Sequence, residues 1–399
     1  MIEWLRRVDP ERPFLWAGNR CWTYGEAVIE VEDRIASEYL VLGPGLEPTS
    51  VFQVLAGLSG GGLTVGGPRG WVSPEPQADL VVFTSGTTGL PKGVRLTRDN
   101  LEAAAAASMK HLGHDAEDNW LLAMPLHHVG GLSIVVRQAY AGGSVTLLPE
   151  FDPVSFSAAM RGRVTMVSVV PTMLRRILGH GPFTGLRAVL VGGGPIPDGL
   201  LEEAVAARLS VLPSYGMTET FGQVATLRPG AQIDRKAHPL PGIDIRIETD
   251  GRIAVRGKQV SPGYLGEPDR LDPWFITNDF GRLDADGALR VLGRSDSVII
   301  TGGENVNPEL VEAALRQHPN VAEVCVIGVA DDEWGQRLVG IYEGDIEPAV
   351  LIGWAHGLLP SHMVPKQMRL VESVPTLSIG KPDRRAVSAS DFSWDDRAD

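Results

Sequence analysis

The 399-residue sequence is poor in cysteine, in long apolar runs and in positive charge. Cys21 and Cys325 are too few for a disulfide framework, and their spacing fits no metal-binding pattern. We expect both to be small buried hydrophobic residues of a cytoplasmic protein. Because glycine or charge interrupts every apolar run, and residues 1–7 lack the pattern of a signal peptide, no membrane span is expected. The net charge of −13 argues against a nucleic-acid partner, which would require a basic surface.

The loop at residues 84–93, Thr-Ser-Gly-Thr-Thr-Gly-Leu-Pro-Lys-Gly, is the most informative segment. It follows the apolar run Leu80–Phe83, which predicts a short buried strand. Glycines let the backbone approach an anion, while backbone N–H groups and hydroxyls donate hydrogen bonds to it. The order of residues is not that of a Walker A motif. A flexible surface turn is the alternative interpretation. The candidate phosphate-binding residues are Thr84, Ser85, Gly86, Thr87, Thr88, Gly89 and Lys92.

Before this loop, the pattern predicts a helix near Tyr24–Leu40 and a Gly/Pro-rich connection over Gly60–Pro76. From 80 to about 225, short apolar runs alternate with amphipathic segments, which predicts a mostly parallel sheet covered on both faces. The expected strands are Asn119–Ala123, Ser144–Leu148, Met166–Val170 and Arg187–Val191, and the expected helices are Asn100–Leu112, Pro171–Leu178 and Asp198–Arg208.

The sequence pattern changes between 240 and 294, where turns separate short predicted strands. Ile243–Glu248, Arg252–Arg256 and Ala288–Leu292 predict a small β-barrel or an antiparallel sheet. The segment after Arg294 predicts a compact α+β unit. We therefore expect an α/β protein with a large domain over 1–294 and a small mobile domain over 295–399, divided near Gly293–Asp296.

The loop 84–93 resembles the phosphate loop of the adenylate-forming superfamily, which includes acyl-CoA synthetases, adenylation domains of nonribosomal peptide synthesis and luciferases. These enzymes activate a carboxylate with ATP to give an acyl-adenylate and pyrophosphate, and many then pass the acyl group to a thiol. Further motifs follow in family order across residues 80–385. The resemblance implies ATP, Mg²⁺ and coenzyme A as cofactors or co-substrates. Family members usually carry more sequence before this loop, so we expect a shortened N-terminal half-domain.

The motif Ser-Tyr-Gly-Met-Thr-Glu at 214–219 is the second family signature. The resemblance implies that Tyr215 stacks beside adenine, that Thr218 contacts phosphate and that Glu219 helps to hold Mg²⁺. A carboxylate suits a hard cation that bridges phosphates. Taken alone, such a hexapeptide would be a loop and a helix cap. The same resemblance assigns five further residues to the nucleotide and acyl border: Gly192, Gly193, Gly194, Gly216 and Met217.

Three motifs lie nearer to the carboxyl end. In Thr-Asn-Asp at 277–279, Asp279 matches the acceptor for the ribose hydroxyls, although Asn278 replaces the usual glycine. Arg294 matches a residue that contacts ribose and phosphate, and Asp296 matches the hinge of the small domain. A solvated turn is the alternative for each. Lys92, Arg294 and Lys381 are candidates for the local positive potential that an acidic ATP-binding protein needs.

Two further family positions belong to moving parts. Gly302 and Gly303 resemble the loop that reaches the site for the thiol step, and a plain strand-to-helix turn is an equal alternative. Lys381, in Ser-Ile-Gly-Lys-Pro-Asp-Arg, matches the lysine that bridges the attacking carboxylate and the α-phosphate. Otherwise it would be an exposed lysine in a turn.

The segment Met-Pro-Leu-His-His-Val-Gly-Gly-Leu-Ser-Ile-Val-Val-Arg at 124–137 bears on the acid. It is similar to the o-succinylbenzoate–CoA ligases of menaquinone synthesis within the superfamily. That substrate has two carboxylates, of which one stays anionic. His128 would line the acyl pocket, Thr172 would border the same cavity, and Arg137 would neutralise the second carboxylate. An equal alternative for Arg137 is a structural acid or a helix end.

Ligation of o-succinylbenzoate to coenzyme A is the leading functional hypothesis. Alternatives are another aryl or small to medium-chain acyl-CoA synthetase, an adenylation enzyme that loads a carrier protein, and a non-catalytic nucleotide-binding or scaffold protein. The expected partners are small molecules, with no nucleic acid and no membrane span. Assembly into a homo-oligomer is compatible with the sequence.

Overall fold

The structure is a computed structural model of the whole chain. It describes residues 1–399 except 44, 68–77, 85–90, 184, 195, 197, 232–235, 295–298, 302–303, 332, 378–381, 391, 393 and 395–399, and the side chains of residues 198, 300 and 305 also lie outside the description. Several sequence-predicted site residues fall in these gaps: Ser85, Gly86, Thr87, Thr88, Gly89, Asp296, Gly302, Gly303 and Lys381.

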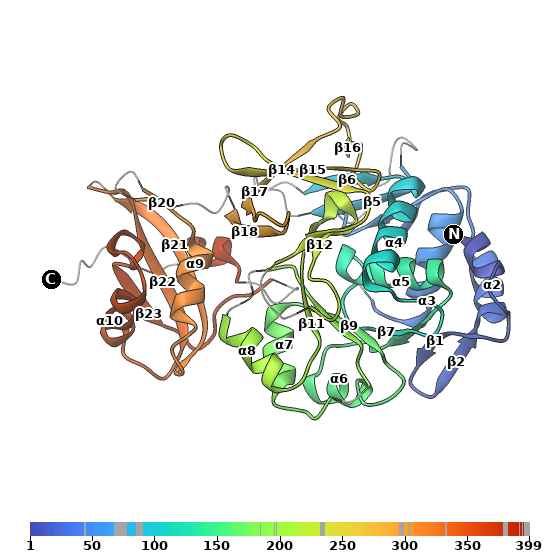
Figure 1. Cartoon of the computed structure of the whole chain (residues 1–399), viewed down its shortest axis with the longest axis horizontal. Coiled ribbons are helices and arrows are strands. Elements are labelled where there is room, and N and C mark those ends of the chain that lie inside the picture. The colour runs from blue at the N-terminus through green and yellow to red at the C-terminus, as the bar shows by residue number, and fades with distance from the viewer. Residues whose placement is uncertain are drawn as a thin grey trace.

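A nine-stranded sheet forms the centre of the N-terminal part (Figure 1). Its order is β13-β12-β11-β10-β9-β7-β8-β1-β2, and the strands from β11 to β1 run parallel. The bounds are β1 (Pro13–Ala17), β2 (Arg20–Thr23), β7 (Asn119–Leu122), β8 (Ser144–Leu147), β9 (Met166–Val169), β10 (Ala188–Val191), β11 (Val211–Met217), β12 (Gly222–Thr226) and β13 (His238–Pro239). In β7, β9 and β10 every residue is buried, as expected where helices cover both faces of parallel strands.

Helices cover this sheet and join its strands. They are α1 (Ile2–Arg6), α2 (Tyr24–Glu32), α3 (Pro48–Ser59), α4 (Arg98–Leu112), α5 (Val129–Ala141), α6 (Pro153–Ala159), α7 (Pro171–Leu178) and α8 (Asp198–Ala206). Local sequence fixes their ends. Thr23 and Thr97 form capping boxes with Glu26 and Asn100 before α2 and α4. The left-handed Gly113 ends α4. The predicted alternation of strands and helices from 80 to 225 is thus confirmed.

A second sheet carries the predicted phosphate loop. Its order is β16-β6-β5-β4-β3, and its strands are β3 (Leu40–Leu42), β4 (Leu63–Val65), β5 (Leu80–Thr84), β6 (Lys92–Leu96) and β16 (Gly263–Tyr264). β5 and β6 are antiparallel neighbours that flank residues 85–90. The loop therefore begins and ends on rigid strands.

A third, four-stranded sheet has the order β14-β15-β17-β18, and all of its neighbours are antiparallel. The bounds are β14 (Ile243–Ile247), β15 (Arg252–Gly257), β17 (Phe275–Leu283) and β18 (Leu289–Arg294). Its apolar residues pack with Val224 and Ala225 of β12 in one cluster, which fixes this sheet against the edge of the large one. The antiparallel-sheet alternative of the sequence prediction agrees with this arrangement.

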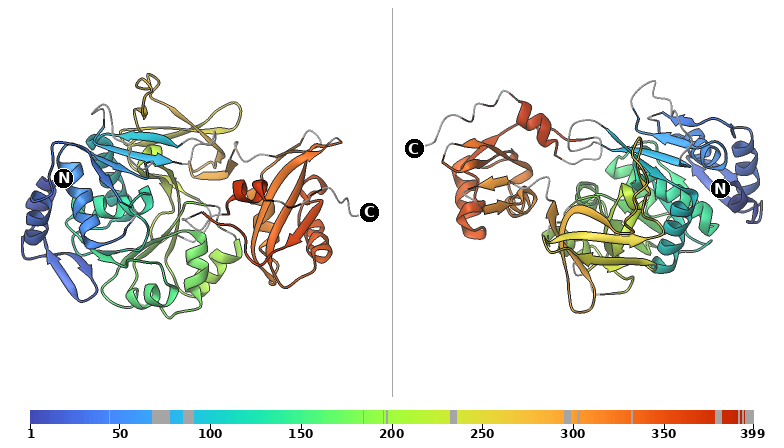
Figure 2. Two further views of the ribbon diagram at one scale, coloured as in Figure 1. Left: turned by 180° about the vertical axis from the view of Figure 1, so that it is seen from behind. Right: turned by 90° about the horizontal axis from the view of Figure 1, so that it is seen from above.

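The C-terminal part has its own sheet and its own apolar clusters. Its strands are β19 (Ile299–Thr301), β20 (Glu304–Val306), β21 (Val321–Asp331), β22 (Gly335–Gly344) and β23 (Gln367–Leu370), and its helices are α9 (Pro308–Leu315), α10 (Pro348–Leu358) and α11 (Arg384–Ala389). This is the expected α+β unit. Figures 1 and 2 place α11 on the side of this sheet that faces the N-terminal part. The exact domain boundary stays a prediction, because residues 295–298 lie outside the description.

Three sequence predictions for the first 80 residues were wrong. The helix predicted over Tyr24–Leu40 ends at Glu32, because Leu40–Leu42 pairs with β4 as a parallel strand. The Gly/Pro-rich connection contains that strand, β4. Cys325 is buried as expected, whereas Cys21 is only half-buried.

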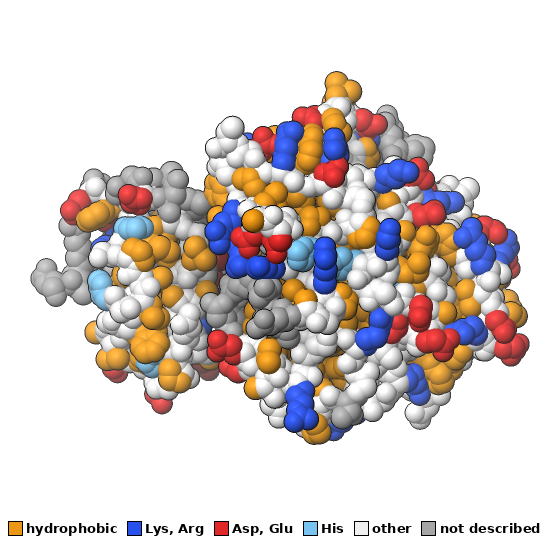
Figure 3. Space-filling model, viewed as in Figure 1, with side chains coloured by type: hydrophobic (Ala, Val, Ile, Leu, Met, Phe, Trp, Pro, Cys, Tyr) orange, Lys and Arg blue, Asp and Glu red, His pale blue; other side chains and the backbone are white. Residues whose placement is uncertain are grey.

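Charged side chains of both signs are interspersed on the face shown in Figure 3. Among the described residues, no helix combines the length and the apolar character that crossing a bilayer requires.

Candidate functional site

The carboxyl ends of β10 and β11 bring two of the predicted motifs together. These strands are parallel neighbours, so the segments that follow them emerge at the same edge of the sheet. Gly192 lies so close to β11 that a Cβ there would be 2.9 Å from the carbonyl oxygen of Ser214. Gly193 has a φ of +77°, and Gly194 follows it. The glycines thus let the backbone lie flat beside the motif at 214–219, as predicted.

Tyr215, Asp279 and Arg294 form one polar cluster at this edge. The Tyr215 hydroxyl donates to Oδ2 of Asp279 at 2.7 Å, and Nη1 of Arg294 lies 3.6 Å from Oδ1. Asp279 and Arg294 are directly paired residues of β17 and β18. Burial and the neighbouring Asp279 raise the pKa of Tyr215, so its phenol stays neutral and keeps its proton for donation. Tyr215 thus meets Asp279, 64 positions further along the chain, and the roles of the three residues toward the nucleotide stay predictions.

The remaining residues of the 214–219 motif shape the turn. Gly216 pairs with Gln223 of β12, and a Cβ at Gly216 would lie 1.9 Å from the carbonyl oxygen of Gly222, so only glycine fits. Met217 packs against the cluster that joins β12 to the third sheet. Thr218 opens a single 3-10 turn, Thr218–Thr220, which carries Glu219.

Thr84 and Lys92 are the candidate phosphate-binding residues that the structure describes, and they are paired across β5 and β6. The Thr84 hydroxyl donates to the Lys92 carbonyl oxygen at 3.4 Å. Lys92 is exposed, and its Nζ lies 5.4 Å from the centroid of the Tyr264 ring. Lys92, the cation of the loop, is therefore the first residue of β6 and points its charge to the surface.

Glu219 is the candidate magnesium ligand. Its Oε1 accepts a hydrogen bond of 2.9 Å from the Tyr264 hydroxyl, and within the described residues its Oε2 receives none. Mg²⁺ in nucleotide sites uses one or two carboxylates together with substrate phosphates. No cluster of three or more His, Cys, Asp or Glu side chains suited to a metal occurs among the described residues. A single carboxylate with an uncommitted oxygen fits an ion that ATP brings with it.

On the acyl side, His128 precedes α5 and stacks with His127 at a centroid distance of 4.4 Å. Burial lowers the pKa of His127. Thr172 is half-buried in the first turn of α7. A Cβ at Gly193 would lie 3.3 Å from Cγ1 of Val170, which immediately precedes α7. Gly193 and the start of α7 therefore lie side by side, and their role in an acyl pocket stays a prediction.

Arg137 is the most unusual residue of this side. It is only 4% exposed, and no hydrogen bond or ion pair joins it to any described residue. Its guanidinium lies over Trp120, 5.4 Å from the ring centroid, and Nη2 lies 3.3 Å from where a Cβ of Gly222 would be. Burial lowers the pKa of Arg137 to about 9, so it is a cation at neutral pH. The alternative that Arg137 pairs with a structural acid finds no such acid in the described chain.

Sequence reasoning missed Tyr264, which contacts both Lys92 and Glu219. Its only local signal is the Ser-Pro-Gly-Tyr-Leu turn at 261–265, a pattern with no chemistry of its own.

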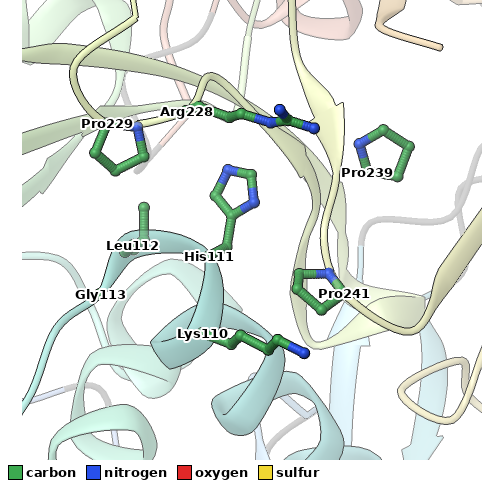
Figure 4. A pocket seen from close by; sticks show the side chains of 8 residues that line it. All are labelled: Lys110, His111, Leu112, Gly113, Arg228, Pro229, Pro239 and Pro241. Atoms are coloured by element: carbon green, nitrogen blue, oxygen red, sulfur yellow. The ribbon is translucent and has the colours of Figure 1, made fainter.

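A separate hollow of about 480 Å³ lies at the end of α4, beside the segments around β13 (Figure 4). Lys110, His111 and Arg228 line it together with prolines. The His111 ring nitrogen Nε2 is 3.0 Å from the carbonyl oxygen of Thr226. None of the sequence-predicted site residues borders this hollow, so it is distinct from the candidate site.

Comparison with protein families agrees with this geometry. Residues 65–265 match the family described as AMP-binding enzyme, and residues 310–381 match the AMP-binding enzyme C-terminal domain. The 2-succinylbenzoate–CoA ligase of Bacillus mycoides is 38% identical over 333 residues, covering 77% of this chain and 69% of that protein. The enzyme of the same name from Listeria monocytogenes is 37% identical over 322 residues, with the same coverage.

Solved structures give the same result. The o-succinylbenzoate CoA synthetase of Bacillus subtilis in complex with the acyl-adenylate intermediate has a TM-score of 0.85 and 27% identity, covering 97% of this chain and 98% of that one. Its complex with ATP and magnesium ion has a TM-score of 0.84, 27% identity and coverages of 96% and 99%. MatB from Rhodopseudomonas palustris, at 22% identity and a TM-score of 0.83, shares the fold. The chain belongs to the AMP-binding enzyme family, the adenylate-forming enzymes.

Proposed function

We propose that this chain is an ATP-dependent acid–CoA ligase that converts o-succinylbenzoate into o-succinylbenzoyl-CoA in menaquinone biosynthesis. The relatives named for this acid support the proposal. The buried, unpaired Arg137 carries it. A buried cation without a counter-ion is unfavourable unless a ligand brings the opposite charge. A dicarboxylic acid does so, because one carboxylate reacts while the other remains anionic.

The same residue explains why a monocarboxylic acid would be a poor substrate. Such an acid fills the pocket but leaves the guanidinium desolvated and unpaired. A site built around a charged or hydrogen-bonding group rejects analogues that lack the complementary group far more strongly than a purely apolar pocket does. The N-terminal end of α5 holds His128 near the reacting end, and Arg137 lies further along the same helix. One rigid element thus sets the distance between the two ends of the acid.

The chemistry has two steps. A carboxylate oxygen of the acid attacks the α-phosphorus of ATP, and the bond between the α-phosphorus and the bridging oxygen breaks, releasing pyrophosphate. The sulfur of coenzyme A then attacks the acyl carbon, the bond to the phosphate oxygen breaks, and AMP leaves. Tyr215, Asp279 and Arg294 would hold the adenosine end, and Lys92 would stabilise the departing pyrophosphate. Mg²⁺, held by Glu219, would neutralise phosphate charge.

Four residues of the proposed mechanism lie outside the described chain and stay predictions. Lys381 would bridge the attacking carboxylate and the α-phosphate. Rotation near Asp296 would then withdraw it and bring Gly302 and Gly303 toward the thiol route. The acceptor, coenzyme A or a carrier-protein thiol, is part of the proposal, and so are the cytoplasmic location and any homo-oligomer.

An acid panel tests the proposal. Purified full-length protein is supplied with ATP, Mg²⁺, coenzyme A and either o-succinylbenzoate or 4-oxo-4-phenylbutanoate, which lacks the ring carboxylate. We expect kcat/KM for thioester formation to be about 100-fold higher for the diacid, and Arg137→Met to remove most of that difference. Equal efficiency with both acids in the native protein would refute the assignment of the acid. Turnover only with a carrier protein would refute coenzyme A as acceptor.

A second variant tests the adenylation chemistry. We expect Lys381→Ala to suppress acid-dependent ATP–pyrophosphate exchange while ATP binding, measured by calorimetry, is retained. Exchange at the full native rate in this variant would show that the role assigned to Lys381 is wrong.

A further inference from the structure

Two groups that the proposed function uses meet on one side chain. The Tyr264 hydroxyl donates a hydrogen bond of 2.9 Å to Oε1 of Glu219, and the face of its ring lies 5.4 Å from Nζ of Lys92. Glu219 is the candidate ligand for Mg²⁺, and Lys92 is the cation of the phosphate loop. The two residues are far apart in the sequence, with Lys92 on β6 and Glu219 in the 3-10 turn Thr218–Thr220, yet Tyr264 touches both of them.

Tyr264 is itself held firmly. It pairs with Val94 as part of β16, next to β6, so the strand that begins with Lys92 also fixes its backbone. The backbone N–H of Ser261 donates to the Glu219 carbonyl oxygen at 2.7 Å. The Ser261 hydroxyl in turn donates to the Arg95 carbonyl oxygen at 2.6 Å. The turn that carries Tyr264 is therefore attached both to the phosphate-loop strand and to the segment of Glu219.

The chemistry of the phenol suits this place. A tyrosine phenol carries its proton throughout the neutral range, and the Tyr264 hydroxyl directs it at Oε1 of Glu219. A donor on Oε1 orients the carboxylate and leaves Oε2 for a cation, as hydrogen-bond partners commonly do for metal ligands. The ring face attracts the Lys92 ammonium group through a cation–π interaction.

We infer that Tyr264 is a positioning residue for adenylation: it sets the separation between Lys92, which takes the departing pyrophosphate, and the Glu219 carboxylate, which holds Mg²⁺. It acts through these two groups. The inference rests on the proposed function only in that the site binds Mg·ATP for adenylation, and it is independent of the identity of the acid.

Tyr264→Phe tests the hydroxyl while keeping the ring. Using Mn²⁺ as the probe, water-proton relaxation in the presence of ATP should show an affinity for the ion about tenfold weaker than in the native protein. The Mg²⁺ concentration for half-maximal ATP–pyrophosphate exchange should rise by a similar factor, and excess Mg²⁺ should restore the rate. Thioester formation from supplied acyl-adenylate and coenzyme A should be unchanged, because that step needs neither Mg²⁺ nor pyrophosphate. Tyr140→Phe, which removes a hydroxyl from a half-buried ring packed on Trp4, is the matched control and should match the native protein.

A double-mutant cycle separates positioning from general weakening. Glu219→Gln should lose Mn²⁺ affinity by itself, and adding Tyr264→Phe should then cost no more than about twofold. Additive losses would overturn the inference, as would Mn²⁺ affinity and Mg²⁺ dependence within about twofold of native in Tyr264→Phe. If no acid supports exchange, the proposed function fails, yet the Mn²⁺ measurement with ATP still decides the role of Tyr264.

Discussion

Two arginines, one in each part of the chain, differ in whether an acidic side chain compensates their charge. Arg137 is 4% exposed and has no hydrogen-bond or ionic partner in the described chain. Arg384, at the start of α11, donates from Nη2 to both carboxylate oxygens of Glu312, at 2.8 and 2.7 Å, and from Nε to the carbonyl oxygen of Val326. Burial lowers the pKa of Arg137 to about 9. Burial would also lower the pKa of Arg384, but the surrounding charges, that of Glu312 first, and the hydrogen bond to Glu312 together outweigh burial, and the pKa is raised.

Arg384 is paired within the fold and has a structural role, whereas Arg137 is the arginine for which we propose a ligand. In the C-terminal part, Glu312 also accepts from the backbone N–H of Val326 and lies 3.7 Å from Arg316, so its charge is fully used within the fold. Arg137 is 4% exposed, against 27% for the Arg384 side chain, and it has no such compensation among the described residues. Replacing each arginine by methionine, which has similar length and no charge, should therefore have opposite effects on stability.

Arg384→Met should have the largest effect. It leaves the Glu312 carboxylate, 3% exposed, without the guanidinium that donates to both of its oxygens, and we expect the free energy of unfolding of the C-terminal part to fall by about 3 kcal/mol. Urea denaturation followed by the fluorescence of the nearby tryptophans measures this. Glu333→Gln, at an exposed position, is the control. An unchanged midpoint for Arg384→Met would mean that the pair does not stabilise the fold.

A pH titration probes the surroundings of Arg137. His114 is 2% exposed, its ring meets Trp120 edge-on, and burial followed by the charge of Arg137 lowers its pKa to about 4. The folded-state pKa lies below the unfolded value of 6.5, so the unfolded chain binds the proton first as the pH falls, and stability is lost from pH 6.5 down to about 4.

Because of His114, the free energy of unfolding should fall by about 2 kcal/mol when the pH is lowered from 7 to 5. His114→Asn cannot titrate in this range, so its loss over the same interval should be smaller by that amount. Urea denaturation at both pH values makes the comparison, and equal losses in the two proteins would exclude His114 as the source.

Arg137→Met should be mildly stabilising in the absence of substrate. Removing an uncompensated buried charge should raise the unfolding free energy by about 1 kcal/mol, although activity on the diacid falls. Thermal unfolding of the two proteins, each with and without o-succinylbenzoate, is the measurement. Destabilisation without ligand would show that Arg137 has a structural partner after all, and the contrast with Arg384 would disappear.

Arg252→Met should have the smallest effect. Arg252 pairs with Asp250 at 2.7 Å, but both side chains are well exposed to solvent. Exposed pairs contribute little, so we expect the midpoint of thermal unfolding to stay within about 1 °C of native. A larger shift would mean that burial is not what distinguishes the three arginines.

The sequence predicts the large domain well where short strands alternate regularly with helices, as in residues 119–206. The alternation is broken in the first 80 residues, where β1 and β2 follow one another as an antiparallel pair with no helix between them. The partner of β1 is β8, more than 120 positions away, and no local pattern encodes such a pairing.

The candidate site divides in the same way. Tyr215, Glu219 and Asp279 were found because each belongs to a motif of several residues. Two other features depend on which segments the sheets bring together. One is the lack of an ionic partner for Arg137 among the described residues, and the other is the contact of Tyr264 with both Lys92 and Glu219. These properties arise only with tertiary structure, so the sequence left the role of Arg137 open and did not single out Tyr264.

The glycine at position 222 has a consequence for redesign of acid selectivity. The φ of +104° at Gly222 disfavours any side chain there. The surface that Gly222 places against Arg137 therefore consists of backbone atoms only. Nothing can be trimmed there to admit a bulkier acid. Under the proposed function, a bulkier acid would require a substitution on α5, at Ser133 or at Arg137 itself, and the latter would also remove the cation proposed to bind the second carboxylate.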